Sequence, residues 1–235
     1  SCSFQHRTIE EELADDRPAL AAHYAQSALR AQEEGDYRQA ADLYRKAIEL
    51  VPYDPDLHNN LGTCFYYLGR IDSAIAEFKE AVRLLPSYST GYVNLGNAYR
   101  LQKCYDLAIA ALREALRLEP TDARAHTALG LTYDEMGKLD LARKEYETSV
   151  RLAPSDVVAR FNLGSAYLRL GYLNPAIENF RYVTAEEIEN AQAHYLLAVA
   201  LLAKCDPDGA LQELQALQEH PSMRKDALNL MGLAR

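Results

Sequence analysis

The sequence predicts an all-α fold, a right-handed superhelical α-solenoid of antiparallel helix hairpins. Three observations lead to this prediction. Small residues recur in one register, bulky apolar residues recur beside them, and proline recurs every 34 residues, at Pro52, Pro86, Pro120 and Pro154. Such a period is typical of repeat proteins, in which a single hairpin cannot bury its apolar face and neighbouring hairpins must stack to share a core.

Six units fit this register without insertion. They span residues 21–54, 55–88, 89–122, 123–156, 157–190 and 191–224. Residues 1–20 form an N-terminal lead-in and residues 225–235 form a C-terminal segment. The position of a residue is its place within its unit, so that position 1 is residue 21, 55, 89, 123, 157 or 191.

Small and bulky residues alternate between the two expected helices of each unit. Position 20 is alanine in all six units. Position 8 is small (Ala28, Gly62, Gly96, Gly130, Gly164 and Ala198), and position 24 is bulky (Tyr44, Phe78, Leu112, Tyr146, Phe180 and Leu214). Small side chains let two helix backbones approach closely. We therefore expect the bulky residue of the second helix to pack against the small residues of the first.

Glycine and proline mark the expected turns. Position 15 is glycine in four units, at Gly35, Gly69, Gly137 and Gly171. Glycine can adopt the left-handed conformation that ends a helix, and proline at position 32 stops the second helix. The last two units depart from this pattern, with Ile188 and Ser222 at position 32 and Pro221 one residue early.

Both ends of the chain carry helix signals. Thr8 and Glu11 have the spacing of a capping box, and Asp16 before Pro18 predicts the start of the next helix. Residues 225–235 repeat the first-helix pattern with Leu228, Met231 and Gly232. This segment suits either a capping helix or a truncated seventh repeat.

The repeated residues resemble the tetratricopeptide repeat family over residues 21–224. The shared pattern is a leucine and a small residue at positions 7 and 8, an aromatic residue at position 11, then alanine, a bulky residue and proline. Position 4, often tryptophan in the family, departs from it with Tyr24, His58, Tyr92, His126, Arg160 and His194. The resemblance implies that the first helix of each repeat lines a concave surface and the second lies outside.

Composition excludes several classes of function. The chain has a formal net charge of -9, which would repel a phosphate backbone, so we expect no nucleic acid partner. Its apolar stretches are too short for a transmembrane segment, and the first residues lack the order of a signal peptide.

The four cysteines, Cys2, Cys64, Cys104 and Cys205, include no CxxC pair and no zinc or disulfide spacing. A reducing, cytoplasmic location is the simpler interpretation. The alternative is a bacterial lipoprotein anchored through Cys2.

No pattern in the sequence supports an enzyme or a cofactor. There is no GxGxxG or GxxxxGK[ST] phosphate loop and no GxSxG elbow. His58, His126 and His194 lie 68 residues apart, at equivalent places of alternate repeats. Stacked repeats would hold them too far apart to share a metal, so we expect packing residues and no metal site.

In the family geometry, positions 2, 5, 6, 9, 12 and 13 face the concave groove. The polar part of this surface comprises Asn59, Asn60, Thr63, Tyr66, Tyr67, Asn94, Asn97, Arg100 and Asn162. Asparagine can both donate to and accept from the backbone of an extended peptide. Asn60, Asn94 and Asn162 share position 6, similar to the asparagine ladder of O-linked N-acetylglucosamine transferase. The alternative is that asparagine is simply a common solvated helix residue here.

The groove positions of repeats five and six are apolar. They carry Phe161, Leu168, Tyr195, Leu196, Val199 and Leu202, interrupted by Arg169. An exposed apolar surface of this kind predicts a cover, either a partner helix, a second copy of the chain or a segment of this one. The alternative is that these residues pack internally.

Some family members clamp the C-terminal carboxylate of chaperones, but the best window for such a clamp here keeps only Asn94 and one cation. The sequence thus predicts a non-catalytic protein–protein interaction scaffold that binds a peptide or partner helix in the concave groove. Two alternatives remain open: a self-associating assembly protein, possible as a homo-oligomer, and the targeting domain of a larger enzyme.

Overall fold

The computed structural model describes residues 16–217 and 224–233, and all regular structure in these residues is helical. Thirteen helices follow one another in this part of the chain. They form two compact units, which divide at residues 120 and 121, next to the boundary between the third and fourth repeats. The predicted all-α fold of stacked hairpins is confirmed.

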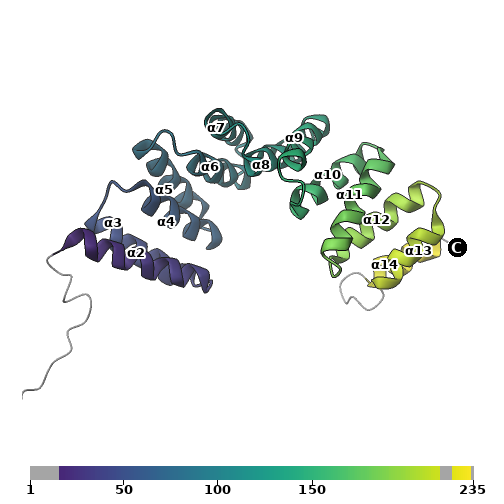
Figure 1. Cartoon of the computed structure of the whole chain (residues 1–235), viewed down its shortest axis with the longest axis horizontal. Coiled ribbons are helices and arrows are strands. Elements are labelled where there is room, and N and C mark those ends of the chain that lie inside the picture. The colour runs from purple at the N-terminus through teal and green to yellow at the C-terminus, as the bar shows by residue number, and fades with distance from the viewer. Residues whose placement is uncertain (1–15, 218–223, 234–235) are drawn as a thin grey trace, which may run out of the picture. The chain divides into compact units, whose positions relative to one another are not determined.

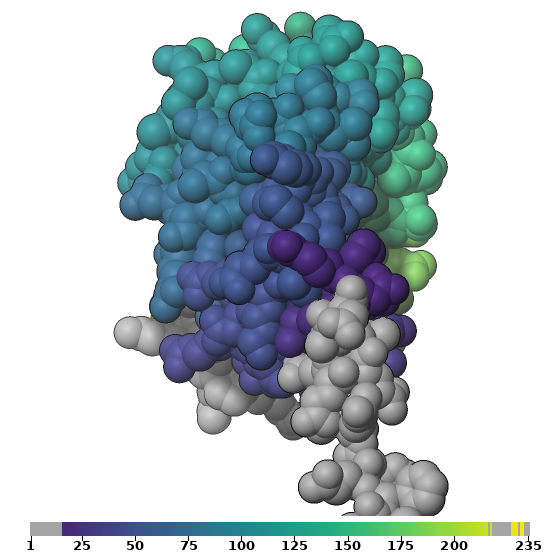
Figure 2. Space-filling view, turned by 90° about the vertical axis from the view of Figure 1, so that its left-hand side faces the viewer, coloured from purple at the N-terminus to yellow at the C-terminus, as the bar shows by residue number. Residues whose placement is uncertain are grey.

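The first unit holds three hairpins (Figure 1). Its helices are α2 (Arg17–Glu33), α3 (Tyr37–Leu50), α4 (Pro55–Tyr67), α5 (Ile71–Leu84), α6 (Ser89–Leu101) and α7 (Tyr105–Leu118). The helices of each hairpin pack on each other, α3 and α5 also pack on the next hairpin of this unit, and α4 contacts α6 directly. In the space-filling view, the purple surface of α2 faces the viewer at one end of this unit (Figure 2).

The second unit repeats the same order and adds one helix. Its helices are α8 (Ala123–Glu135), α9 (Leu139–Leu152), α10 (Val157–Arg169), α11 (Leu173–Glu186), α12 (Ala191–Ala203), α13 (Pro207–Ala216) and α14 (Arg224–Leu233). The first helix α8 contacts α10, and α10 contacts α12. The helix α14 packs on α13 and buries Ala227 and Met231, whereas Leu228 is 52% exposed.

Acidic and amide side chains begin many of the helices. Asp16 accepts a hydrogen bond from the backbone N–H of Ala19, which confirms the predicted helix start before Pro18. Asp54 and Asp156 do the same for α4 and α10, and Asn190 for α12. Each of these caps satisfies a backbone donor that the first helical turn leaves free.

The turn inside each hairpin uses a left-handed residue at position 15. The four predicted glycines have positive φ there, such as 82° at Gly35 and 72° at Gly69. Lys103 and Cys205 stand at the same position of repeats three and six and adopt the same conformation, with φ of 59° and 64°. The turn geometry is therefore kept in all six repeats, although these two side chains make it costly.

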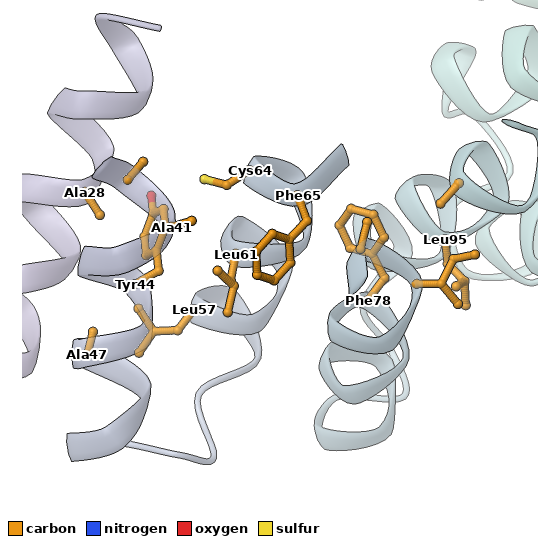
Figure 3. Packing of buried hydrophobic residues seen from close by; sticks show 14 of the residues in the cluster. Ala28, Ala41, Tyr44, Ala47, Leu57, Leu61, Cys64, Phe65, Phe78 and Leu95 are labelled. Carbon is orange, nitrogen blue, oxygen red and sulfur yellow. The ribbon is translucent and has the colours of Figure 1, made fainter. Parts of the chain in front are cut away.

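The bulky residue at position 24 fills the space left at position 8, as the sequence predicts. A Cβ added to Gly62 would lie 2.7 Å from the Phe78 ring, and one added to Gly130 would lie 2.5 Å from the Tyr146 ring. Figure 3 shows Phe78, Tyr44, Leu61 and their neighbours in the core of the first unit. In these two hairpins any larger residue at position 8 would have to displace a buried aromatic ring.

Several sequence predictions fall outside the described residues. These are the Thr8 and Glu11 capping box, the interpretation of Cys2, and the register change at Pro221 and Ser222. In the described part of the chain, no helix combines the length and the apolar character that crossing a bilayer requires.

Candidate functional site

A pocket of about 210 Å³ lies on the first helices of repeats two and three. It is lined by Thr63, Tyr66 and Tyr67 of α4, Phe78 of α5, and Asn94 and Asn97 of α6. We call it the repeat 2–3 pocket. Five of its six lining residues belong to the polar groove predicted from the sequence, and the structure brings them together.

Asn59 does not line this pocket, but it accepts hydrogen bonds from two residues that do. The residue is only 6% exposed, although position 5 was expected to face the groove. The side-chain oxygen of Asn59 accepts a 2.8 Å hydrogen bond from the Asn94 amide, and its backbone oxygen accepts one of 2.9 Å from the Thr63 hydroxyl. Asn59 therefore orients two of the side chains that line the pocket.

Three tyrosines form an aromatic corner at the edge of the pocket. The rings of Tyr66 and Tyr67 lie 5.8 Å apart with an interplanar angle of 83°. Tyr37, at the start of α3, stacks on Tyr67 with ring centroids 4.5 Å apart. Tyr67 is nevertheless 61% exposed, so its outer surface is open to a ligand. Tyr37 was not predicted as a site residue, since it lies outside the six groove positions.

A second, more open hollow of about 740 Å³ lies on α2 and α4 of the first unit. Its lining includes His23, Gln26, Leu29, Asp54, Asp56 and Asn60. Asn60 was predicted as a groove residue, whereas the others were not singled out. Three of them do occupy groove positions, namely Gln26, Leu29 and Asp56, so the same position rule could have found them.

The remaining predicted polar residues are half-buried. Arg100 lies on α6, one turn beyond Asn97, and has an interaction partner within the chain. Asn162 lies on α10 of the second unit.

The predicted apolar surface is partly packed. All six residues (Phe161 and Leu168 of α10, and Tyr195, Leu196, Val199 and Leu202 of α12) are half-buried. All but Val199 pack against the buried cluster of the second unit, and the Phe161 ring meets the Phe180 ring at 6.0 Å. Arg169, which interrupts this surface in the sequence, forms an ion pair with Asp134 of the preceding repeat. The exposure of these six side chains is therefore intermediate between the two predictions, full exposure and internal packing.

In repeats one, two, four, five and six the residue at position 4 contacts the second helix of its own hairpin, and in repeats two, five and six it also contacts the preceding turn. In the even repeats, His58, His126 and His194 place Nδ1 2.6–2.7 Å from a carboxylate oxygen of the second helix, 19 residues later. These carboxylates belong to Glu77, Glu145 and Glu213. Nε2 of His58 and of His194 also lies 3.0 Å from a backbone carbonyl oxygen of the turn before the repeat.

Repeats one and five use a cation over an aromatic ring at the same junction. Arg160 lies 4.0 Å from the Tyr182 ring centroid and donates to the Pro154 carbonyl, and Lys46 lies over the Tyr24 ring. Position 4 is therefore a structural junction in these repeats, as expected of packing residues. The partner glutamates were not predicted from the sequence, although each follows its histidine at a constant spacing of 19 residues.

Comparison with known proteins identifies the repeats. The family model described as "Tetratricopeptide repeat" matches residues 26–89, 127–174 and 175–224, and the one described as "TPR repeat" matches residues 96–137. No curated protein matches the sequence.

Several solved structures share the fold. Pseudomonas aeruginosa pilF matches with a TM-score of 0.81 and 23% identity, over 92% of this chain and 99% of that one. PilW, described as a type IV pilus biogenesis factor, matches with a TM-score of 0.79 and 21% identity, over 90% and 98%. YrrB, described as a TPR protein with an unusual peptide-binding site, matches with a TM-score of 0.65 and 26% identity, over 80% and 97%. Together with the 34-residue register and the packed hairpins, these matches show that the chain belongs to the tetratricopeptide repeat family.

Proposed function

We propose that this chain is a non-catalytic binding module that holds an extended segment of a partner protein against the first helices of repeats two and three. Tetratricopeptide repeats generally mediate protein–protein interaction, and YrrB, which resembles this chain, is described as having a peptide-binding site. The observation that carries the proposal is the repeat 2–3 pocket, which gathers five predicted groove residues from two helices.

The chemistry of this surface suits an extended backbone. An extended segment leaves its N–H and C=O groups without partners, and burying them unpaired costs free energy. Asn94 and Asn97 in the pocket, and Asn60 in the neighbouring hollow, supply amides that can both donate and accept. Tyr66 and Tyr67 add aromatic contact area, which is typical of residues that contribute strongly to binding.

The proposal is tested with a random peptide library displayed to the purified full chain, followed by calorimetric titration of the selected peptides. Changing Asn60, Asn94 and Tyr66 together to alanine should weaken binding of these peptides at least about tenfold. A matched control carries alanine at Tyr53, which is 77% exposed in a turn, and at Asn174, an exposed residue of α11. Peptides that bind the triple variant as tightly as the unchanged chain would show that the groove is not the binding surface.

The apolar surface of repeats five and six favours a second candidate, self-association or the binding of a partner helix. Apart from Gln192 and His194, the helix α12 carries only apolar and aromatic side chains, which is typical of a helix that is largely covered. Yet Tyr195, Leu196, Val199 and Leu202 stay half-exposed. Few side chains there could pair with an extended backbone, whereas a helix pairs its own backbone groups. Light scattering over a concentration series tests this candidate, and a monomer at high concentration would count against self-association.

A further inference from the structure

Building on the proposed function, we infer that the repeat 2–3 pocket binds the side chain of an arginine carried by the extended partner segment. The pocket holds about 210 Å³, below the roughly 300–1,000 Å³ that is usual for small-molecule sites. A space of this size suits one side chain of a peptide better than a whole small molecule. The identity of that side chain follows from the hydrogen-bonding groups and rings that the pocket presents.

Within the described part of the chain, the hydrogen bonds inside the wall use one donor each of Thr63 and Asn94 and leave their acceptors available. The Thr63 hydroxyl donates its hydrogen to the backbone oxygen of Asn59, so it can only accept from a ligand. The Asn94 amide donates one hydrogen to the Asn59 side chain, and among the contacts of the described residues its own carbonyl oxygen stays available. Among these same contacts, the second N–H of Asn94 and the Asn97 amide also stay available, so the wall offers acceptors to a donor-rich group without lacking donors of its own.

The aromatic corner selects for a flat cation. The Tyr66 and Tyr67 rings stand nearly at right angles, and Tyr37 stacks on one face of Tyr67. A guanidinium group stacks on aromatic faces and carries five N–H donors with no acceptor, so it fits both the rings and the acceptors. A lysine ammonium carries donors as well, but it lacks the plane that could stack on a tyrosine.

Other side chains fit the pocket less well. An apolar group would separate the Thr63, Asn94 and Asn97 side chains from water without replacing their hydrogen bonds. A carboxylate is bound most strongly by cationic groups, and the six lining residues include no lysine or arginine. Arg100, the nearest cation along α6, is outside the lining and already has a partner within the chain. The net charge of -9 also favours a cationic ligand.

The decisive experiment titrates four short peptides into the full chain and follows the side-chain amide signals of Asn94 and Asn97 by NMR. The peptides share the blocked sequence Gly-Ala-Xaa-Ala-Gly, where Xaa is arginine, citrulline, lysine or leucine. Citrulline is a neutral group of nearly the same shape as arginine. We expect the arginine peptide to bind about fivefold to tenfold more tightly than the citrulline peptide and to shift both amide signals.

Variants assign the effect to the pocket. Tyr66→Ala and Asn97→Ala should each remove most of the preference for arginine over citrulline, while the controls Tyr53→Ala and Asn174→Ala should keep it. The comparison of arginine with citrulline uses the unchanged chain, so it stays informative even if a pocket variant unfolds. Equal binding of arginine and citrulline, equal binding of arginine and lysine, or no binding at all would overturn the inference.

The library selection separates this inference from the proposed function. If the selected peptides need Asn60, Asn94 and Tyr66 but carry no arginine, the groove binds peptides and the assignment of arginine to the pocket is wrong. If the selection yields no peptide that depends on these residues, the proposed function itself fails. Selected peptides with one recurring arginine, whose change to citrulline weakens binding, would support both.

Discussion

The polar surface of repeats two and three and the apolar surface of repeats five and six occupy equivalent positions of the same repeat. In the first, most of the places at positions 6, 9, 12 and 13 hold asparagine or tyrosine, and in the second half of these places hold leucine or valine. The hairpins beneath them are alike, since positions 7, 8, 20 and 24 are buried in all four of these repeats. One scaffold thus presents two chemistries, one able to pair with an exposed backbone and the other suited to a partner whose backbone is already paired.

If the two regions differ only at their surfaces, equivalent substitutions in their cores should lower the free energy of unfolding by equal amounts. Phe78→Ala in the first unit and Phe180→Ala in the second each remove a fully buried ring that fills the space beside a position-8 glycine. Each should lower the free energy of unfolding by about 3–5 kcal/mol. Urea unfolding followed by circular dichroism measures the loss. Clearly unequal losses would show that the two cores are not equivalent.

The position-4 junctions offer a second comparison between the units. His58→Ala and His194→Ala each leave a glutamate and a backbone carbonyl without a partner, so each should cost about 1–3 kcal/mol of unfolding free energy. Double-mutant cycles with Glu77→Gln and Glu213→Gln measure the coupling within each pair. A coupling energy near zero in both units would mean that the histidines act by packing alone.

The left-handed residues at position 15 give a smaller effect of opposite sign. Lys103→Gly in the first unit and Cys205→Gly in the second should each stabilise the chain by about 0.5–1 kcal/mol, because glycine adopts positive φ without a steric penalty. Gly69→Ala and Gly171→Ala should destabilise their units by a similar amount. Thermal unfolding measures all four changes. A loss of stability in Lys103→Gly or Cys205→Gly would contradict the strain argument.

The cysteines of the two units should differ in their reactivity toward a thiol reagent, because, among the described residues, one cysteine of the first unit is buried and one cysteine in each unit is exposed. Cys64 is buried, and this burial raises its pKa to about 11, whereas Cys104 and Cys205 are exposed. At pH 8 iodoacetamide should modify Cys104 and Cys205 quickly and Cys64 only after unfolding, as read by peptide mass spectrometry. Rapid modification of Cys64 in the folded chain would show that α4 opens locally.

The raised pKa of Cys64 also predicts the direction of a pH effect. The folded chain holds the thiol proton more tightly than the unfolded chain does, so this contribution to stability is complete below about pH 9. It should be lost as the pH rises from about 9 to 11. Cys64→Ala should remove this part of the alkaline loss, which a series of urea unfolding curves can detect.

Local rules of sequence were enough to predict the hairpins. Each packing pair, such as Gly62 with Phe78, lies within one repeat and recurs at a constant spacing of 16 residues, so periodicity alone identifies it. The start of α2 after Asp16 also follows from capping chemistry that involves only neighbouring residues. Features set by short-range geometry can therefore be predicted from the sequence.

Contacts between neighbouring hairpins were harder to predict. Asn59 was placed in the groove with its neighbours, yet it and Val93, both at position 5, are buried. Because α4 packs directly on α6, this edge of the first helix turns toward the next repeat instead of the ligand. How far a position turns inward depends on the packing of adjacent repeats, which no periodic pattern records. The stacking of Tyr37 on Tyr67 was missed for the same reason.

The buried amide of Asn59 has a consequence for how this binding surface could diversify. The two side chains that it orients, Asn94 and Thr63, line the pocket, but Asn59 itself is outside the reach of a ligand. A replacement at residue 59 could therefore change which partners are accepted and still be absent from any footprint of the complex. Surveys of natural or engineered variants that scan only contacting residues would overlook this determinant of selectivity.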